Sequence, residues 1–174
     1  LRGVVHAAAV LRDATLANLN AEAIEQVWRP KVTGAWNLHE ATRGRDLDFF
    51  VLMSSMASLL GSPGQANYAS ANAWLDALAG WRRQQGLPGL SINWGLWGEV
   101  GLAAQSENRG ARLADRGMSA LTPELGLELF GRLLWMERSQ AAVMRLNLRQ
   151  WRQFYPKATL PALSGLDACQ RTTA

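Results

Sequence analysis

The chain has 174 residues, 48% of them hydrophobic and 18% charged, with a formal net charge of +4 at pH 7. These proportions are typical of a globular domain with a sizeable core, and they exclude a generally disordered chain. The basic residues are spread along the sequence without interleaved aromatic residues, which argues against a nucleic-acid-binding surface.

The first expected element is a buried strand at Val4 and Val5, followed by a tight turn through the small residues 7–9. A helix is expected from about Asn20, whose side chain can cap it, to around Gly44, because apolar residues recur there near helical spacing. Since a domain rarely begins inside its core, the opening strand leads us to expect the second half of a larger unit.

Two further strands and a second long helix follow. Residues 49–53 read as a buried strand that ends at two serines, and residues 61–65 form a loop by composition. A helix is expected from about 67 to 86, and a third strand over 90–94. Strand, helix, strand, helix, strand is the pattern of right-handed βαβ units. We therefore predict an α/β fold, the second half of a Rossmann-type doubly wound parallel sheet.

The last part of the domain is expected to be mixed. Residues 104–117 read as a loop and short helical lid, and a helix begins after the capping residue Thr122. The apolar stripe 125–136 on that helix is expected to join the core, and residues 141–146 are expected to form a last strand.

Several classes of protein are not expected. The lone cysteine, Cys169, cannot form an internal disulfide, and no signal peptide is recognisable, so a cytoplasmic setting is expected. The longest apolar run, 49–60, is interrupted by serines and is too short to span a bilayer. Paired Cys/His spacings for a metal are absent from the sequence. Residues 1–153 are assigned to the domain and 154–174 to a linker or tail.

Polar side chains fall where three of the strands are expected to end: His6, Ser55 and Asn93. Ligands of open α/β sheets bind at this carboxyl edge. The nearby helix start presents Tyr68 and, four residues later, Asn72, so both lie on one helical face. We interpret His6 as a packed polar group. Ser55, Tyr68 and a lysine on the preceding helix, Lys31, form a candidate proton-transfer site.

Reduction of a ketone needs a hydride at carbon and a proton at oxygen. A phenol has an ordinary pKa of about 10, and a neighbouring ammonium lowers it by favouring the phenolate. Lys31 can supply that charge to Tyr68, and the Ser55 hydroxyl can hold the ketone oxygen. Asn72 can orient the lysine or a proton-carrying water.

Residues 53–73, MSSMASLLGSPGQANYASANA, resemble the active-site segment of modular polyketide synthase ketoreductase domains, which belong to the short-chain dehydrogenase/reductase superfamily. Residues 4–8 and 93–97 resemble the flanking segments of the same family, and the similarity extends from Leu1 to about Trp151. The resemblance implies a Rossmann-type fold and a reductase activity.

The resemblance also assigns catalytic residues. The serine of the family corresponds to Ser55, its tyrosine to Tyr68 and its asparagine to Asn72. Its lysine corresponds to Lys31, within the segment 29–34. Ordinary members of the superfamily carry the lysine four residues after the tyrosine, where this sequence has Asn72, an exchange typical of the polyketide synthase branch.

NADPH is the cofactor that the resemblance implies. The substrate implied is a β-ketoacyl thioester on the phosphopantetheine arm of an acyl carrier protein. The implied partners are the upstream half of the ketoreductase and the neighbouring synthase domains. The upstream half is implied because the glycine-rich phosphate loop of the family would precede Leu1, and no G-x-G-x-x-G occurs in this sequence. The cofactor contacts implied within the chain are Ala7, Ala8, Trp94, Gly95 and Leu96.

Three residues are implied in substrate handling and stereocontrol: Asp13, Leu60 and Gln65. The class of ketoreductase that gives D-configured, B-type products carries a Leu-Asp-Asp motif, of which Leu11-Arg12-Asp13 keeps the last aspartate. The opposite class carries a tryptophan eight residues before the tyrosine, where this sequence has Leu60. A D-hydroxy product is therefore expected.

Alternatives remain at this point. Asp13 can equally be a solvated loop acid, and Trp94 can be core packing. The chain can also be a non-catalytic scaffold that lacks the phosphate loop, or a stand-alone reductase of small ketones.

Overall fold

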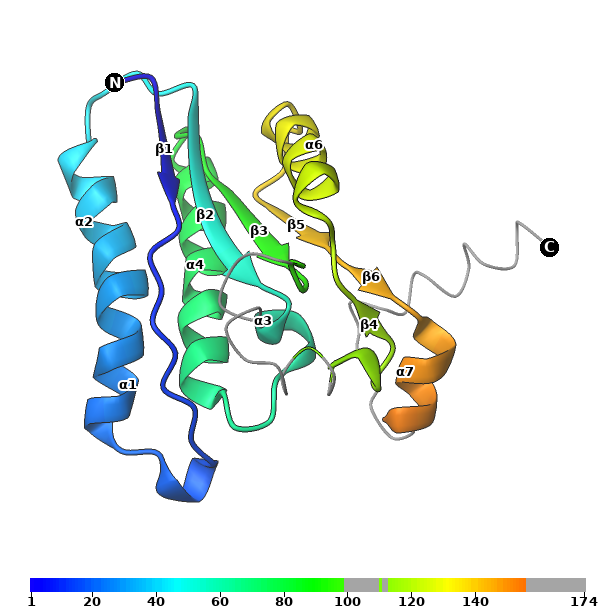
Figure 1. Cartoon of the computed structure of the whole chain (residues 1–174). Coiled ribbons are helices and arrows are strands. Elements are labelled where there is room, and N and C mark those ends of the chain that lie inside the picture. The colour runs from blue at the N-terminus through cyan, green and yellow to red at the C-terminus, as the bar shows by residue number, and fades with distance from the viewer. Residues whose placement is uncertain (99–109, 111–112, 156–174) are drawn as a thin grey trace.

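The computed structural model describes residues 1–98, 110 and 113–155 of the chain. Its main sheet contains four strands, all parallel, in the order β1-β2-β3-β5 (Figure 1). The strands are β1 (Gly3–His6), β2 (Phe49–Ser55), β3 (Leu90–Trp94) and β5 (Gln140–Val143). The predicted parallel α/β sheet and its first three strands are confirmed.

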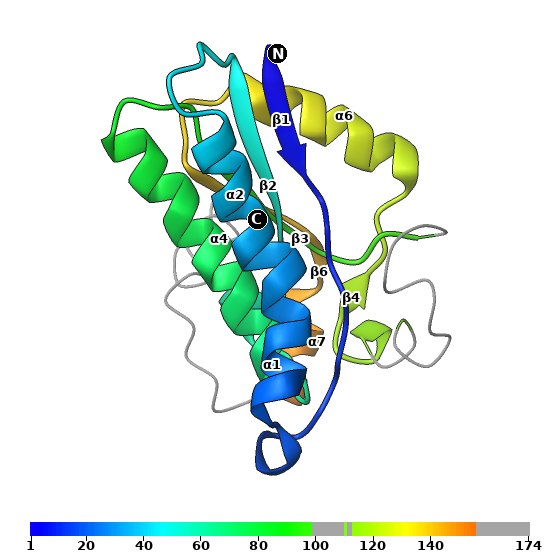
Figure 2. The ribbon, with the colours of Figure 1, turned by 90° about the vertical axis from the view of Figure 1, so that its left-hand side faces the viewer.

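Helices cover both faces of this sheet. The helices α1 (Ala21–Trp28), α2 (Gly34–Ala41) and α4 (Ala66–Gln84) lie on one face, and α6 (Pro123–Leu134) lies on the other (Figures 1 and 2). Thr122 caps α6 as predicted, accepting a 3.3 Å hydrogen bond from the Leu125 N–H. Doubly covered parallel strands are apolar on both faces, which explains the continuous hydrophobic run in β2.

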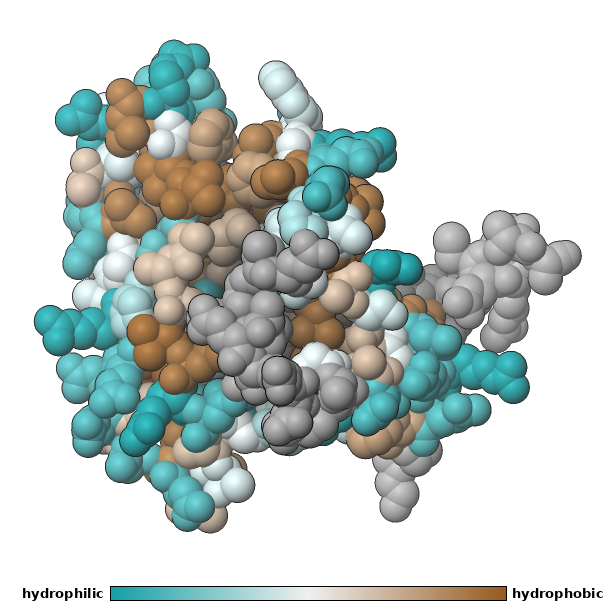
Figure 3. All heavy atoms as spheres, viewed as in Figure 1, coloured by the Kyte–Doolittle hydropathy of each residue, from teal (hydrophilic) through white to brown (hydrophobic). Residues whose placement is uncertain are grey.

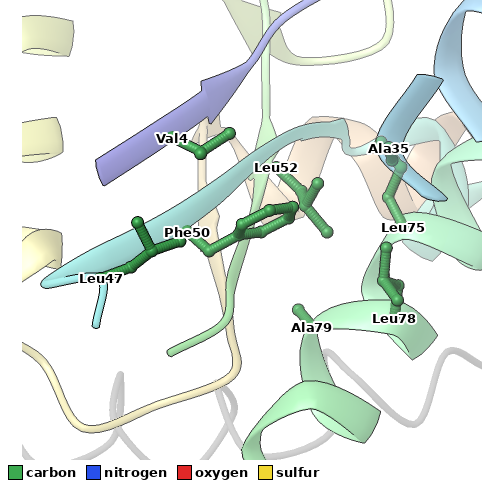
Figure 4. Close-up of a cluster of buried hydrophobic side chains, with 8 residues drawn as sticks. All are labelled: Val4, Ala35, Leu47, Phe50, Leu52, Leu75, Leu78 and Ala79. Atoms are coloured by element: carbon green, nitrogen blue, oxygen red, sulfur yellow. The ribbon is translucent and has the colours of Figure 1, made fainter. Parts of the chain in front are cut away.

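Two hydrophobic clusters fill the space between the sheet and its helices. Successive residues of β2 point to opposite faces, so Phe50 and Leu52 enter one cluster and Val51 enters the other. The first cluster lies between the sheet and the helices α2 and α4 (Figure 4) and consists of Val4, Ala35, Leu47, Phe50, Leu52, Leu75, Leu78 and Ala79. The second cluster joins the sheet to α6.

The first predicted helix is interrupted. Asn20 caps it as expected, accepting a 2.8 Å bond from the Ala23 N–H. However, a π-helical turn, Arg29–Thr33, separates α1 from α2, and α2 ends at Ala41. Pro30 has no N–H to donate to the α-helical ladder, and the Gly34 N–H reaches back to the Arg29 carbonyl instead. The wide turn places Lys31 inside the molecule, where 2% of it is exposed.

Short elements complete the described structure: α3 (Ala57–Leu60), α7 (Leu148–Phe154), a 3₁₀ turn at Leu16–Asn18, and the antiparallel pair β4 (Met118–Ser119) and β6 (Arg145–Leu146). The predicted last strand is therefore two strands, β5 and β6, which belong to different sheets. The expectation that the apolar stripe continues in the core to Met136 was wrong, because 41% of that residue is exposed. Most of the predicted lid, 104–117, and the tail after Tyr155 lie outside the described residues.

Figure 3 shows hydrophobic residues gathered on the face of the molecule that carries β1 and β2. Val5 is 48% exposed there although it lies within a strand. Within the described ranges, no helix combines the length and the apolar character needed to cross a lipid bilayer.

Candidate active site

A cavity of about 250 Å³ lies at the carboxyl edge of the sheet. The end of β2, the first turn of α4 and the loop after β3 contribute to its wall. The sequence-predicted site residues that line it are Ala7, Lys31, Ser55, Leu60, Gln65, Tyr68, Trp94, Gly95 and Leu96. The structure thus brings most of the expected site together from five separate segments.

Lys31 enters the cavity from the π-helical turn. Its ammonium donates a 2.8 Å hydrogen bond to the Met53 carbonyl oxygen and lies 5.5 Å from the centroid of the Tyr68 ring. Burial lowers the pKa of Lys31 from its ordinary value of 10.5 to about 8, while the negative charge of Asp76 acts in the opposite direction. Lys31 is therefore an ammonium at neutral pH that can lose its proton in mildly alkaline solution.

His6 supports this turn and takes no place on the cavity wall. Its Nε2 atom lies 3.0 Å from the Lys31 carbonyl oxygen, and 5% of the residue is exposed. Burial lowers its pKa below 6.5, so the ring is neutral at pH 7 and its Nε2–H donates to that carbonyl. The interpretation of His6 as a packed polar group is confirmed.

Ser55 is the last residue of β2. Its Oγ accepts a 3.2 Å hydrogen bond from the Ala57 N–H, and its carbonyl accepts a 2.9 Å bond from the Ser58 hydroxyl. Because the backbone N–H occupies a lone pair of Oγ, the hydroxyl proton can be donated into the cavity. Ser54 also lines the cavity, but it is buried and its hydroxyl donates to the Asn72 carbonyl over 3.2 Å, which supports the interpretation of Ser54 as structural.

Asn72 is fully buried and lies behind the turn of α4 that carries Tyr68. Its Nδ2 donates a 2.7 Å hydrogen bond to the Tyr68 carbonyl oxygen. Among the described residues its Oδ1 has no hydrogen-bond partner. Asn72 therefore supports the tyrosine turn, and its relay of protons stays a prediction.

The strand-end residue Asn93 is also fully buried and faces away from the cavity. Its amide nitrogen lies 2.9 and 3.0 Å from the two carboxylate oxygens of Asp76. Sequence reasoning missed Asp76. The available signal was its position eight residues after Tyr68 and four after Asn72, which places all three on one helical face.

Two of the three residues expected to control stereochemistry lie on the cavity wall. Leu60 and Gln65 line it, whereas Asp13 does not. Asp13 reaches the site through Gln65, whose Nε2 donates a 3.0 Å bond to the Asp13 carboxylate. A backbone bond of 2.9 Å from the Ala14 N–H to the Gly64 carbonyl fixes the two segments together.

The residues expected to contact a cofactor are small or apolar, and most of them lie on the cavity wall. Ala7 and Ala9 line the cavity, while Ala8 does not. A Cβ atom on Gly95 would lie 2.9 Å from the Cβ of Met144, so only glycine fits there. Trp94 lines the cavity, and 95% of it is buried. Core packing and a place on the cavity wall therefore both apply to this residue. Small and flat apolar surfaces beside Ser55 fit the nicotinamide end of a dinucleotide.

Another part of the wall comes from α7 and Tyr155, where no site residue was expected, and from Arg116, which lies in the segment 104–117 predicted as a lid. Trp151 of α7 and the following Tyr155 line the cavity, and their rings lie 5.2 Å apart. Arg116 lines it as well, with its guanidinium 5.8 Å from the Tyr155 ring centroid. The second residue of the expected linker 154–174, Tyr155, thus belongs to the cavity wall.

Comparison with known proteins places this geometry in a family. Residues 1–99 match the KR domain family. The chain is 52% identical over 137 residues to a phthioceranic/hydroxyphthioceranic acid synthase of Mycobacterium tuberculosis, covering 77% of the chain and 6% of that synthase. It is 51% identical over 143 residues to a mycocerosic acid synthase-like polyketide synthase of Mycolicibacterium smegmatis, covering 79% of the chain and 6% of that protein.

Solved structures of ketoreductases share the fold of this chain. The fold matches a structure titled "Structure of A1-type ketoreductase" with a TM-score of 0.90 at 36% identity, over 99% of the chain and 37% of that protein. It matches A-type ketoreductases from a modular polyketide synthase with a TM-score of 0.88 at 39% identity, over 94% and 34%. The chain thus spans about a third of these ketoreductases and a small fraction of the synthases. It belongs to the family of polyketide synthase ketoreductase (KR) domains.

Proposed function

We propose that this chain is the catalytic part of a ketoreductase domain that reduces a β-ketoacyl thioester to a β-hydroxyacyl thioester with NADPH. The observation that carries the proposal is the convergence of Lys31, Ser55 and Tyr68 on one cavity, with the ammonium 5.5 Å from the tyrosine ring centroid. An acid, a hydrogen-bond donor and a fixed positive charge are what carbonyl reduction requires of a protein.

In the proposed reaction the ketone oxygen accepts a hydrogen bond from the Ser55 hydroxyl. NADPH, when bound, supplies the hydride that attacks the carbonyl carbon. The π electrons of the carbonyl move onto oxygen, and the Tyr68 hydroxyl donates its proton to that oxygen. The Lys31 ammonium stabilises the phenolate that remains, which then regains a proton from solvent. Asn72 holds the helical turn of Tyr68 through its 2.7 Å bond to the backbone.

The proposed product is the D-configured, B-type alcohol. Asp13 keeps the last aspartate of the motif of that class, and its carboxylate is tied to the cavity residue Gln65. Leu60 stands on the cavity wall where the opposite class has tryptophan. Structures titled as A-type share the fold at 36–39% identity, but residues 11–13 and 60 carry the class assignment.

The proposed substrate carrier is an acyl carrier protein with a phosphopantetheine arm, and the proposed partners are the upstream half of the domain and the neighbouring synthase domains. The support is the context of the relatives, which are polyketide synthases many times longer than the chain. The sequence has no glycine-rich phosphate loop, so the upstream half would hold the pyrophosphate of NADPH.

Replacement of Tyr68 by phenylalanine tests the proposal in the complete ketoreductase domain. Loss of the proton donor is expected to lower kcat by about 10²- to 10⁴-fold while the Kd of NADPH is unchanged. Tyr155→Phe, which removes the other tyrosine hydroxyl from the same cavity wall, is expected to lose far less. Turnover by Tyr68→Phe at the wild-type rate would falsify the assignment, and failure of the wild-type domain to bind NADPH would favour a scaffold role.

A further inference from the structure

Asp76 lies one helical turn beyond Asn72 and two turns beyond Tyr68 on α4. It stands outside the cavity wall, so it touches neither the proposed substrate nor the proposed cofactor. Its partly buried carboxylate nevertheless accepts hydrogen bonds from several side chains of neighbouring elements. A carboxylate held this firmly beside a site, but not in it, can only act through its neighbours.

Three side chains from two other elements bind this carboxylate. The Ser58 hydroxyl of α3 donates over 2.8 Å to Oδ2, and the Ser91 hydroxyl of β3 donates over 2.5 Å to Oδ1. The Asn93 amide of β3 approaches both oxygens at 2.9 and 3.0 Å. Hydrogen bonds to an ionised acceptor are stronger than neutral ones. Asp76 therefore holds α3, β3 and α4 together directly behind the cavity.

The contacts continue from Asp76 to the expected catalytic serine. The Ser58 hydroxyl also lies 2.9 Å from the Ser55 carbonyl oxygen, and the Asn93 amide lies 3.1 Å from the Ser54 hydroxyl. The Asn93 amide has two protons and the Ser58 hydroxyl has one. The same two donor groups therefore serve both the Asp76 carboxylate and the neighbouring serines 54 and 55. The position of Ser55 thus depends on the carboxylate two contacts away.

Asp76 also contributes charge. The titratable groups that influence Lys31 are His6 from β1, which bonds its carbonyl, Tyr68 from α4, whose ring lies beside its ammonium, and Asp76 from α4, which acts through its charge. His6 is a neutral ring and Tyr68 an uncharged phenol before reaction, so Asp76 is the anion among the described groups that acts on Lys31. A buried ammonium without a nearby negative charge tends to lose its proton.

We propose that Asp76 is a positioning residue of the reaction: its carboxylate fixes Ser55 and the Tyr68 helix through Ser58, Ser91 and Asn93. This inference rests on the proposed reductase function. It assigns a role in proton transfer to a residue that meets neither substrate nor cofactor.

The test is the pH profile of kcat for Asp76→Asn in the complete ketoreductase domain. The alkaline limb, where Lys31 loses its proton, is expected to move down by about 0.5 to 1 pH unit, because an attractive charge has been removed. Asp48→Asn, which removes a carboxylate from the surface pair with Arg2, serves as the control and is expected to leave the limb in place. If Asp76→Asn does not fold, Asp76→Ser carries the same test with the same expected shift.

A charge swap provides a rescue. In Asp76→Asn/Asn93→Asp the carboxylate and the amide, which contact each other directly, exchange places, so the alkaline limb is expected to return toward the wild-type position. A folded Asp76→Asn or Asp76→Ser domain whose limb coincides with that of wild type would overturn the proposal. That result differs from failure of the proposed function, in which the wild-type domain itself would not reduce a β-ketoacyl thioester.

Discussion

The Lys31 ammonium lies 5.5 Å from the centroid of the Tyr68 ring, although the two residues come from different helices. The π-helical turn makes this possible, because it directs the lysine inward onto the Met53 carbonyl at the edge of the sheet. In this fold the charge beside the tyrosine therefore depends on the packing of two helices, whereas a lysine four residues after the tyrosine would depend on one helix alone.

The pH dependence of catalysis should follow Lys31. Its pKa is lowered to about 8 by burial, so the fraction of ammonium, and with it kcat, should fall as the pH rises through about 8. Steady-state kinetics of the complete domain at saturating NADPH should show this alkaline limb. Lys31→Arg stays protonated throughout that range, so its remaining activity should show no limb near pH 8. The same limb in both proteins would contradict the assignment.

The Ser55 hydroxyl should matter for chemistry more than for cofactor binding. Ser55→Ala removes the donor to the ketone oxygen, and kcat is expected to fall by about 10²- to 10³-fold with little change in the Kd of NADPH. Ser119→Ala, at an exposed position of β4, is the matched control. Equal kcat values for the two variants would exclude Ser55 from the reaction.

Much of this site could be predicted because its signals are local. Buried strands, the start of α4 and the cap at Asn20 are each encoded within a few residues. The break at Arg29–Thr33 was missed because the proline signal sits inside an otherwise periodic helix, and the inward turn is completed by a contact from Lys31 to Met53 in another element. Local periodicity carries no information about that contact.

The other missed features have the same cause. The strand β4 and the separation of β6 from β5 were missed, because β4 and β6 have two residues each, too few for any periodicity, and they exist by pairing with each other. In α7 only Leu148 and Trp151 are buried, so its sequence carries too weak an apolar pattern to predict a helix, although residues up to 153 were assigned to the domain. Asp76 shares a helical face with Tyr68, but its donors come from α3 and β3, and only the folded chain shows that they meet.

Replacement of Gly95 by alanine should destabilise the domain, whereas the same replacement of Gly131 should not. An alanine there would place its Cβ 2.9 Å from Met144, and such overpacking destabilises by about 1–3 kcal/mol. Gly131→Ala in α6 meets nothing within 4 Å and is expected to stabilise the helix by about 0.5–1 kcal/mol. Denaturant unfolding of the two variants measures both effects. A Gly95→Ala domain as stable as wild type would show that the loop after β3 can shift.

The stability of the domain should fall in mild acid because of His39. The His39 Nδ1 accepts a 2.6 Å hydrogen bond from the buried Arg82 guanidinium, which cannot give up its proton. The ring must therefore be neutral with its proton on Nε2. Burial, and then the charge of Arg82, lower the pKa of His39 below its ordinary value of 6.5.

The sign of the effect follows from proton binding. Below about pH 6.5 the unfolded chain takes up a proton at His39 that the folded domain does not, so the free energy of unfolding decreases as the pH falls. His6, whose pKa is also lowered, acts in the same direction. The melting temperature should therefore decrease between about pH 7.5 and about pH 5.5. His39→Gln keeps a side chain that can accept from Arg82 but cannot titrate, so its melting temperature should depend less steeply on pH; an identical slope would assign the acid sensitivity to other groups.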